Sequence, residues 1–354
     1  MALPAEEICF MSPTYRGDID RFQLLRESIT AYGQGHIRHY ALIDTEDLPL
    51  LEHLDLPNVV PVTTAQLLAP EVEAGRIAYN RSGGRVVKRW QRSFNKRLGW
   101  FPNARCYGWQ IQQLLKLAAP AVLPERVFVS FDSDLIACGR FGLDDFMCDG
   151  KVALYESRFA LTKPKEPGGW HGNACRLLDL HDPVNIGEET ADYVAQPFVF
   201  EKSNAQALQQ WLEQRYQQPW WRSVLDLPLG GWSEFMIYGE FVRSHLNYAG
   251  VFQRPVRANS FWIQNRAQFE NAETLIQRAF DDPDVHFLCL QADDHGVWTL
   301  DRYSETVRRC IDASLNPVRA PVRQTRTPRS DNPLEVLGLE RGLELARARS
   351  THGA

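Results

Sequence analysis

The sequence lacks the features that would place it in a membrane or secreted class. It has no run of about 18 apolar residues, the length that a membrane-spanning helix needs. Its first residues carry neither the basic nor the apolar segment of a secretory signal, so we expect a cytoplasmic protein. Its seven cysteines form no C-x-x-C pair and are odd in number, which predicts reduced thiols rather than a disulfide framework or a zinc site.

An excess of positive charge is also missing. The 39 basic residues are outnumbered by 44 acidic ones, and the net charge is −5. A general nucleic-acid-binding protein is usually basic, so we expect no nucleic acid partner. Hydrophobic residues make up 44% and charged residues 23% of the 354 positions. This composition excludes a disordered, collagen-like or coiled-coil chain and predicts a large globular domain.

Positive charge is nevertheless concentrated in one segment. Residues 76–109 hold nine basic side chains and no acidic one. This asymmetry suits a pyrophosphate, a phosphorylated acceptor or an anionic membrane leaflet, although a solvated helical face would also explain it. After residue 316 a basic, proline-bearing linker leads to leucines among charges over 334–349, typical of either an amphipathic helix or a poorly ordered tail. We therefore expect peripheral contact with the inner face of an anionic membrane.

Short apolar runs alternate with helical patterns in the first part of the chain. Residues 8–13 and 39–43 have the composition of buried strands, and residues 19–32 carry apolar side chains at helical spacing. The alternation predicts an α/β fold with a Rossmann-type, mostly parallel sheet flanked by helices, which binds ligands at the carboxyl ends of its strands. Further helices are expected over 47–53, 107–119, 205–216, 270–281 and from 234, and further strands over 59–62, 126–131, 151–155, 192–200 and 286–290.

The most informative motif follows the strand over 127–131. Asp132 and Asp134 leave the end of this apolar strand with one residue between them. Two bare carboxylates there would repel each other, which implies a cation, a proton or a basic partner. Carboxylate oxygens suit Mn²⁺ or Mg²⁺, and such an ion neutralises a pyrophosphate and makes a nucleoside diphosphate a workable leaving group. Both aspartates are therefore candidate metal ligands.

The helix over 109–117, the strand and the D-x-D together resemble the central signature of GT-A glycosyltransferases. The segment over 13–28, which begins Pro-Thr-Tyr-Arg-Gly-Asp, is similar to the start of an uncharacterised bacterial family of DxD-type glycosyltransferases. Residues 233–239, Ser-Glu-Phe-Met-Ile-Tyr-Gly, resemble a third signature of that family. The resemblance covers residues 8–265, and the order and spacing of the motifs carry it.

The resemblance implies a donor site at the strand ends and along the helix over 109–117. The turn after the first strand would hold the nucleoside, and the acid after the second strand would contact base or ribose. Asp132 would lie near the ribose, with Asp134 on the metal, and the polar face of the helix would meet the sugar or phosphates. For Lys116 an exposed helix lysine is an equal alternative. The donor-binding candidates are Thr14, Tyr15, Asp18, Asp44, Gln110, Gln113, Lys116, Asp132 and Gln196.

Glu234 is the candidate catalytic base. Gly230 and Gly231 precede it, and Ser233 is placed to cap a helix that begins at Glu234. Inverting GT-A enzymes have an acidic residue at a helix start near this point, where a carboxylate can take the proton of an acceptor hydroxyl. Many of them have an acidic pair, and this sequence has one acid, so the base and the stereochemistry stay open. A helix-capping acid is the alternative.

Acceptor contacts are expected from aromatic and histidine side chains. The segment 168–173 has the pattern of a loop, which suits either a mobile lid over the donor or a plain glycine-rich turn. His245 is the first candidate for a third metal ligand and His171 the second, and an ordinary histidine explains each as well. The acceptor-binding candidates are Trp170, His171, Trp232 and Tyr238.

Together these features predict a metal-dependent glycosyltransferase that uses a nucleotide-sugar donor, with a UDP- or GDP-sugar as the expected class. The expected acceptor is a hydroxyl of a bacterial surface glycan, such as lipopolysaccharide or capsule, or of its lipid-linked precursor. We expect a GT-A-like domain over 1–316, with a nucleotide-sugar half to about 137 and an acceptor half after it, and a tail over 317–354. Two alternatives stay open: a haloacid-dehalogenase-like phosphatase that uses Asp132, and a non-catalytic nucleotide-sugar-binding protein.

Overall fold

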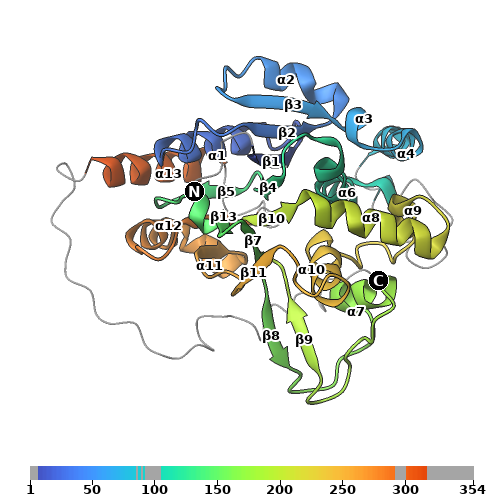
Figure 1. Ribbon diagram of the computed structural model, residues 1–354. Coiled ribbons are helices and arrows are strands. Elements are labelled where there is room, and N and C mark those ends of the chain that lie inside the picture. The colour runs from blue at the N-terminus through green and yellow to red at the C-terminus, as the bar shows by residue number, and fades with distance from the viewer. Residues whose placement is uncertain (1–6, 85–86, 89–90, 92–104, 292–299, 317–354) are drawn as a thin grey trace.

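The computed structural model describes residues 7–84, 87–88, 91, 105–291 and 300–316 (Figure 1). Its central sheet consists of β1 (Ile8–Thr14), β2 (His39–Ile43), β3 (Val59–Thr63), β4 (Val127–Ser130) and β10 (Phe198–Glu201). The strand order is β10-β4-β1-β2-β3. β1 to β4 are parallel, and β10 runs antiparallel to β4 at one edge. This arrangement confirms the predicted mostly parallel α/β sheet.

The register of the sheet brings three strand ends to one edge. Thr14 at the end of β1 is opposite Ile43 at the end of β2, and β4 pairs in parallel with the first half of β1. Every residue of these three strands is buried, as expected for apolar strands covered on both faces. Asp44 and Asp132, which follow β2 and β4, therefore emerge where parallel α/β folds bind ligands.

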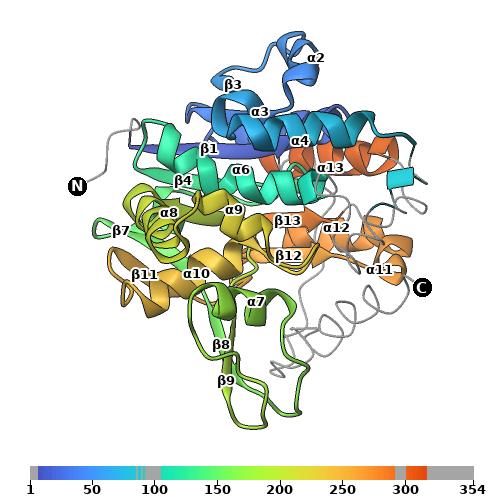
Figure 2. The same cartoon turned by 90° about the vertical axis from the view of Figure 1, so that its right-hand side faces the viewer.

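Helices cover both faces of the sheet (Figures 1 and 2). α1 (Ile19–Ala31) and α13 (Leu300–Leu315) pack together on one face. α3 (Thr64–Leu67), α4 (Pro70–Arg81) and α6 (Gly108–Val122) lie on the other, where Figure 2 shows them in front of the sheet. The polar residues of α6 can therefore reach the edge at which the strands end.

α6 is longer than the sequence predicts. An end before Pro120 is expected because proline has no N–H and clashes with the preceding turn. In the structure Pro120 lies inside the helix, which continues to Val122. The prediction is wrong because the proline lies near the end of α6, where the N–H of Leu123 still bonds to the carbonyl of Ala119 at 2.9 Å.

Smaller sheets and the remaining helices complete the fold. β7 (Lys151–Tyr155) pairs with β11 (Val251–Arg254) and β6 (Met147–Cys148), and β13 (Phe287–Leu290) pairs with β12 (Ser260–Ile263) and β5 (Leu135–Ala137). β8 (Ser157–Ala160) and β9 (Glu189–Asp192) form a ribbon that projects from the body (Figure 1). The other helices are α2 (Leu48–Glu52), α7 (Gly169–Leu177), α8 (Lys202–Tyr216), α9 (Trp220–Leu225), α10 (Glu234–Ser244), α11 (Arg266–Glu270) and α12 (Ala272–Asp281).

The segment 192–200, predicted as one strand, is divided in the structure. β9 ends at Asp192 in the projecting ribbon, and β10 begins at Phe198 in the central sheet. Pro197 lies directly before β10, and a proline cannot donate a hydrogen bond to a strand partner. Because β10 pairs with β4, the second half of the chain contributes an edge strand to the sheet of the first half.

Some expectations concern residues outside the described part of the chain. The tail over 317–354 lies wholly outside it, as do residues 85–86, 89–90 and 92–104 of the basic segment. Among the described helices, none is long and apolar enough to cross a membrane. All seven cysteines lie in the described part, where six are buried, Cys148 is exposed and none forms a disulfide.

Candidate active site

A buried lysine joins the helix before the D-x-D to two acidic residues. The Nζ of Lys116, on α6, lies 2.6 Å from Oδ1 of Asp132 and 2.8 Å from Oε1 of Glu234. Asp132 follows β4, and Glu234 is the first residue of α10. Lys116 and Glu234 are buried, whereas the Asp132 side chain is 38% exposed. Three distant parts of the sequence thus meet at one point that is open to solvent on the Asp132 side.

The charges at this point stabilise one another. Burial disfavours the charged form of Lys116, but the carboxylates of Asp132 and Glu234 outweigh burial and raise the pKa of the lysine. Burial raises the pKa of Glu234, and the ammonium of Lys116 opposes that effect. Lys116 therefore stays protonated, and Glu234 is a stronger base than an exposed glutamate. Removal of one partner would leave a buried charge unpaired.

The start of α10 holds Glu234 against α6. Ser233 caps the helix as predicted, and its Oγ accepts a hydrogen bond from the N–H of Phe235 at 3.3 Å. The N–H of Glu234 donates to Oε1 of Gln113 at 3.2 Å. The ammonium of Lys116 also lies 4.7 Å from the ring centroid of Phe235. Both the backbone and the side chain of Glu234 are therefore positioned by polar residues of α6.

Gln196 and Ser133 fix the backbone of the D-x-D segment. The N–H of Asp132 donates to Oε1 of Gln196 at 3.2 Å, and Oγ of Ser133 donates to the carbonyl of Pro13 at 2.8 Å. The Nε2 of Gln196 is buried and has no hydrogen-bond partner in the part of the chain that the structure describes. A buried donor without a partner costs free energy, so this nitrogen marks a place where a ligand oxygen would be stabilised.

Asp132 and Asp134 offer two half-buried carboxylates to a cation. Mg²⁺ and similar ions are held by one or two carboxylates, and substrate phosphates and water complete the coordination. Both side chains are of the ligand type that such an ion takes, and Asp132 also pairs with Lys116. Within the described ranges, no third His, Cys, Asp or Glu completes a metal cluster with these two residues.

The ends of β1 and β2 carry a second group of polar side chains. Oδ2 of Asp44 lies 2.9 Å from Nη1 of the buried Arg76, which also pairs with Glu46 and Glu73. Burial raises the pKa of Asp44 to about 6, although the Arg76 charge opposes the rise. The buried Oγ1 of Thr14 has no hydrogen-bond partner among the described residues. A hydroxyl and a carboxylate at this edge are groups that can bind a ribose or a base.

Three aromatic rings lie beside the loop that precedes Glu234. The rings of Trp109 and Trp170 stack with centroids 5.7 Å apart, and the ring of Tyr107 stacks on Trp109 at 6.2 Å. The indole N–H of Trp170 donates to the carbonyl of Gly230 at 3.1 Å. The Trp170 side chain is 37% exposed. The rings therefore form an apolar, partly open surface at the rim of the site.

Residues 7–308 match the model of DUF6492, a family of unknown function. The chain belongs to this family. No curated protein matches it. It is similar to the apo form of the glycosyltransferase GlyE from Streptococcus pneumoniae TIGR4, with 10% identity and a TM-score of 0.37 over 88% of this chain. The chain spans only 62% of the length of that enzyme.

Two further solved structures are similar to this DUF6492 chain at low identity. Mouse xyloside xylosyltransferase 1 shares 8% identity with a TM-score of 0.39, over 80% of this chain and 97% of that one. The galactosyltransferase LgtC, in complex with donor and acceptor sugar analogues, shares 10% identity with a TM-score of 0.39, over 85% of this chain and 95% of that one.

Three of the predicted site residues of this DUF6492 chain are buried next to the site and make hydrogen bonds inside the fold. Gln110 and Trp232 are fully buried, and with the Gln110 amide in its favoured orientation its oxygen accepts from the Trp232 indole N–H at 2.7 Å. Tyr238 is fully buried, and its hydroxyl accepts a hydrogen bond from the N–H of Glu201 at 2.9 Å. These side chains use their polar atoms inside the fold, so none of the three faces an acceptor or donor.

His245 lies away from the D-x-D. Its Nε2 is 3.0 Å from the carbonyl oxygen of Leu178, and its ring packs against Trp211 and Phe241. These contacts explain the residue as a packed helix-terminal histidine, and we give it no metal-binding role.

The turn after β1 leads to α1. Asp18 pairs with Arg21 at 2.7 Å, and Nε of Arg21 donates to the hydroxyl of Tyr303 on α13 at 3.0 Å. Tyr15 is 43% exposed beside this turn. Asp18 thus anchors α13 to the turn, and Tyr15 is the more accessible of the two donor candidates.

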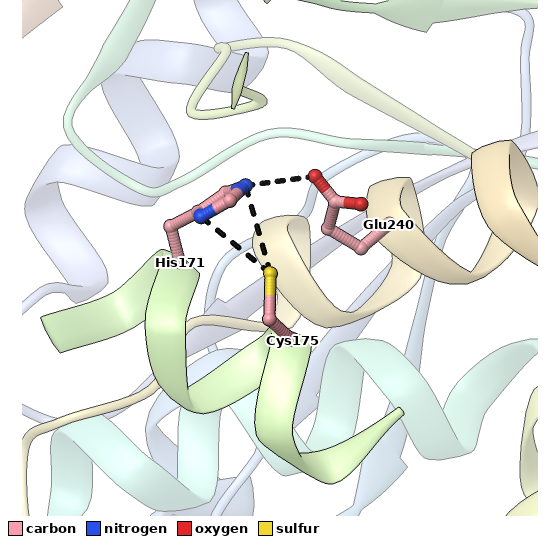
Figure 3. A group of neighbouring side chains, drawn as sticks. All are labelled: His171, Cys175 and Glu240. Carbon is pink, nitrogen blue, oxygen red and sulfur yellow. Dashed lines mark hydrogen bonds and ion pairs between the residues drawn. The ribbon is translucent and has the colours of Figure 1, made fainter. Parts of the chain in front are cut away.

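The segment 168–173 is not a loop. Residues from Gly169 onward form α7, and Asn173 donates from Nδ2 to the carbonyl of Gly231 at 2.6 Å. Glycine content predicts a loop here, but Gly168 and Gly169 supply the positive φ angles of 97° and 67° at the N-cap and first residue of the helix. His171 turns toward Glu240 on α10, with Nε2 2.9 Å from Oε1 (Figure 3).

Proposed function

We propose that this chain is a GT-A-like, metal-dependent glycosyltransferase that moves a sugar from a nucleoside-diphosphate sugar to a hydroxyl group. The proposed acceptor is a bacterial surface glycan or its lipid-linked precursor. The observation that carries the proposal is the contact of Lys116 with both Asp132 and Glu234. It joins the helix, the D-x-D and the candidate base, which the sequence presents as three separate motifs, into one charged centre.

The proposed donor site lies along the carboxyl ends of β1, β2 and β4. Thr14, whose Oγ1 has no hydrogen-bond partner among the described residues, the half-buried Asp44 and the partly exposed Tyr15 lie there and are the proposed nucleoside contacts. The Nε2 of Gln196, beside Asp132, has no partner in the described ranges and is the proposed donor to a sugar or phosphate oxygen. A UDP- or GDP-sugar is the proposed donor class.

A Mn²⁺ or Mg²⁺ ion on Asp132 and Asp134 would neutralise the diphosphate as the bond to the sugar breaks. The protein itself supplies Lys116, a fixed positive charge within 2.6 Å of Asp132. Its ammonium contacts both carboxylates, that of Asp132 on the proposed donor side and that of Glu234 on the proposed acceptor side. Gln113 and Ser233 hold the backbone at the start of α10, from which the Glu234 side chain projects.

In the proposed reaction Glu234 is the general base. It takes the proton of the acceptor hydroxyl while that oxygen forms a bond to the anomeric carbon. The bond from this carbon to the phosphate oxygen breaks, and the nucleoside diphosphate leaves with the electron pair. Oε1 of Glu234 faces Lys116, and Oε2 lies 3.4 Å from Oγ of Ser233, a long contact that leaves it able to accept a proton.

The aromatic rings of Tyr107, Trp109 and Trp170 are the proposed acceptor surface. An aromatic face packs well against the apolar face of a sugar ring, and the hydroxyl groups at the edge of the sugar can then donate hydrogen bonds to backbone carbonyls. Trp170 is anchored to Gly230, four residues before Glu234, so a sugar on its ring would lie close to the base.

The peripheral membrane contact and the domain division remain part of the proposal. The basic segment and the tail that motivate the membrane contact fall largely outside the described residues. Binding of the full chain to vesicles with and without anionic lipid, at low and high salt, tests this part separately.

The deciding experiment measures thermal unfolding with UDP, GDP, CDP or ADP, each with and without Mn²⁺, followed by turnover of the corresponding nucleotide sugars. We expect one nucleotide to raise the melting temperature only with the metal, and Asp134→Asn to abolish that increase. Asp55→Asn, at an exposed aspartate between α2 and β3, is the matched control. Binding without turnover would favour a non-catalytic nucleotide-sugar-binding protein. No binding, with release of phosphate from phosphate esters and a trapped phosphate on Asp132, would favour a phosphatase.

A further inference from the structure

A second cluster of ligand-type side chains lies between α7 and α10, apart from the D-x-D. His171 and Cys175 are four residues apart on α7, so both project from one face of that helix. Glu240 faces them from α10 (Figure 3). Cys175 and Glu240 are buried, and one ligand atom from each of the three residues lies within 4.8 Å of the other two.

We propose that His171, Cys175 and Glu240 bind one Zn²⁺-like transition-metal ion that ties α7 to α10. Imidazole nitrogen, thiolate sulfur and carboxylate oxygen are the three ligand types that zinc takes in proteins, and a water molecule is the usual fourth ligand when the protein supplies three. The His171 side chain is 11% exposed, which leaves one side of the cluster open to that water.

Two of the three distances between the ligand atoms can be compared with those of a tetrahedral site, and the third, between Cys175 and Glu240, is within 4.8 Å. Nε2 of His171 lies 2.9 Å from Oε1 of Glu240 and 3.9 Å from Sγ of Cys175. With ordinary zinc bond lengths these separations become about 3.3 Å and about 3.6 Å. These two separations change by about 0.4 Å and about 0.3 Å. The ring of His171 must also rotate, because Sγ of Cys175 lies nearer to Nδ1, at 3.6 Å, than to Nε2. The hydrogen bond between His171 and Glu240 would be exchanged for two metal bonds.

The neighbours of the cluster orient its members as metal ligands usually are. Oγ1 of Thr190 lies 3.4 Å from Nδ1 of His171, so the hydroxyl can hold the ring with Nε2 turned to Glu240. Arg243 donates from Nε to Oε2 of Glu240 at 2.9 Å and leaves Oε1 for the ion. Partners of this kind fix ligand orientation in metal sites. The charges of the bound site also nearly cancel, because the divalent ion, the thiolate, the carboxylate and the guanidinium have a net charge of +1.

Binding would release one proton, since the Cys175 thiol becomes a thiolate as its sulfur bonds to the ion. The same helix contacts the loop before Glu234 through Trp170 on Gly230 and Asn173 on Gly231. An ion between α7 and α10 would therefore stiffen the backbone that leads to Glu234. That consequence rests on the proposed function, whereas the metal site itself does not.

The test uses the full chain, stripped with a chelator and then titrated with Zn²⁺ or Co²⁺. We expect one equivalent of bound metal by elemental analysis, and a near-ultraviolet thiolate-to-cobalt absorption band with Co²⁺. His171→Gln and Cys175→Ser should lose both, and Cys148→Ser, at an exposed and distant cysteine, should keep both. Asp134→Asn should also keep both, which separates this site from the proposed donor metal.

Several results would overturn the proposal. A chain that binds less than one equivalent, binds Co²⁺ without the thiolate band, or keeps the band in Cys175→Ser does not hold a metal at this cluster. The absence of the band in the wild type overturns the proposal even if one of the variants fails to fold. Loss of transferase activity has no bearing on this readout, so the two proposals can fail independently.

Discussion

Lys116 and Glu234 are 118 residues apart in the sequence, and their charged groups lie 2.8 Å apart in the structure. The contact is made by two buried side chains on different helices, and Asp132 is the third member of the group. Such a group has a net charge of −1 and one open side. It can serve as a site for a cationic or hydroxyl-bearing ligand, and it makes the stability of α10 depend on α6.

The first prediction concerns the buried ion pair. Lys116→Met keeps the length of the side chain and removes its charge, so Glu234 is left buried without a partner. We expect the free energy of unfolding in urea to fall by about 3–5 kcal/mol. In the double variant Lys116→Met/Glu234→Gln, the free energy of unfolding should fall by clearly less than the sum of the two single losses, because no uncompensated charge is left buried. Additive losses would mean that the pair is not coupled.

The second prediction concerns the proposed base. Glu234→Gln keeps the shape of the side chain but cannot take a proton, so turnover should fall at least about 100-fold while the Kd of the donor changes little. Steady-state rates and calorimetric titration with the nucleotide measure the two quantities. Because burial raises the pKa of Glu234, the wild-type rate should fall as the pH is lowered through that raised value. Equal losses of donor binding and turnover would make Glu234 a donor ligand instead.

The parallel sheet could be predicted from the sequence because apolar strands and helical spacing repeat locally. The cap formed by Ser233 and the position of Asp132 at a strand end could also be predicted, since a serine before an acidic helix start and a D-x-D after an apolar strand are short-range signals. These signals depend on neighbours within a few residues. They can therefore be recognised without knowledge of the tertiary structure.

The partners of those residues could not be predicted. The contact of Lys116 with Glu234 depends on how α6 packs against α10, and the spacing of either helix is compatible with an exposed lysine. His245 and Tyr238 have residue types that suit a site, but packing against neighbouring elements turns them inward. Trp109 was missed because an aromatic residue at a helix start looks the same in sequence whether it is packed or open. Its stacking on Trp170 joins residues 61 positions apart.

The third prediction concerns Asp44. Its pKa is raised from 3.8 to about 6 in the folded state, mainly by burial. Between these two values the unfolded chain has lost the proton and the folded chain still holds it, so folding stability from this group falls as the pH rises from about 4 to about 6. Relative to that of Asp44→Asn, the free energy of unfolding of the wild type should fall by at most about 3 kcal/mol over this pH range.

Urea unfolding of wild type and Asp44→Asn at pH 4, 5, 6 and 7 measures this difference. Asp55→Asn, at an exposed aspartate, is the matched control and should follow the wild type at every pH. A constant difference between wild type and Asp44→Asn would show that the Asp44 carboxyl does not titrate in this range. The proposed contact with a nucleoside would then involve a fully ionised carboxylate.

The fourth prediction concerns the aromatic surface. Trp170→Ala removes both the exposed ring and the hydrogen bond to the Gly230 carbonyl, whereas Trp170→Phe removes the hydrogen bond and keeps a ring. If the ring binds the acceptor sugar, the KM for the acceptor should rise about tenfold in Trp170→Ala, in line with about 1.4 kcal/mol of stacking, and much less in Trp170→Phe. The Kd of the donor should be unchanged in both. If Trp170→Phe is as impaired as Trp170→Ala, the indole hydrogen bond that positions the loop before Glu234 is the important contact, and the ring does not bind the acceptor.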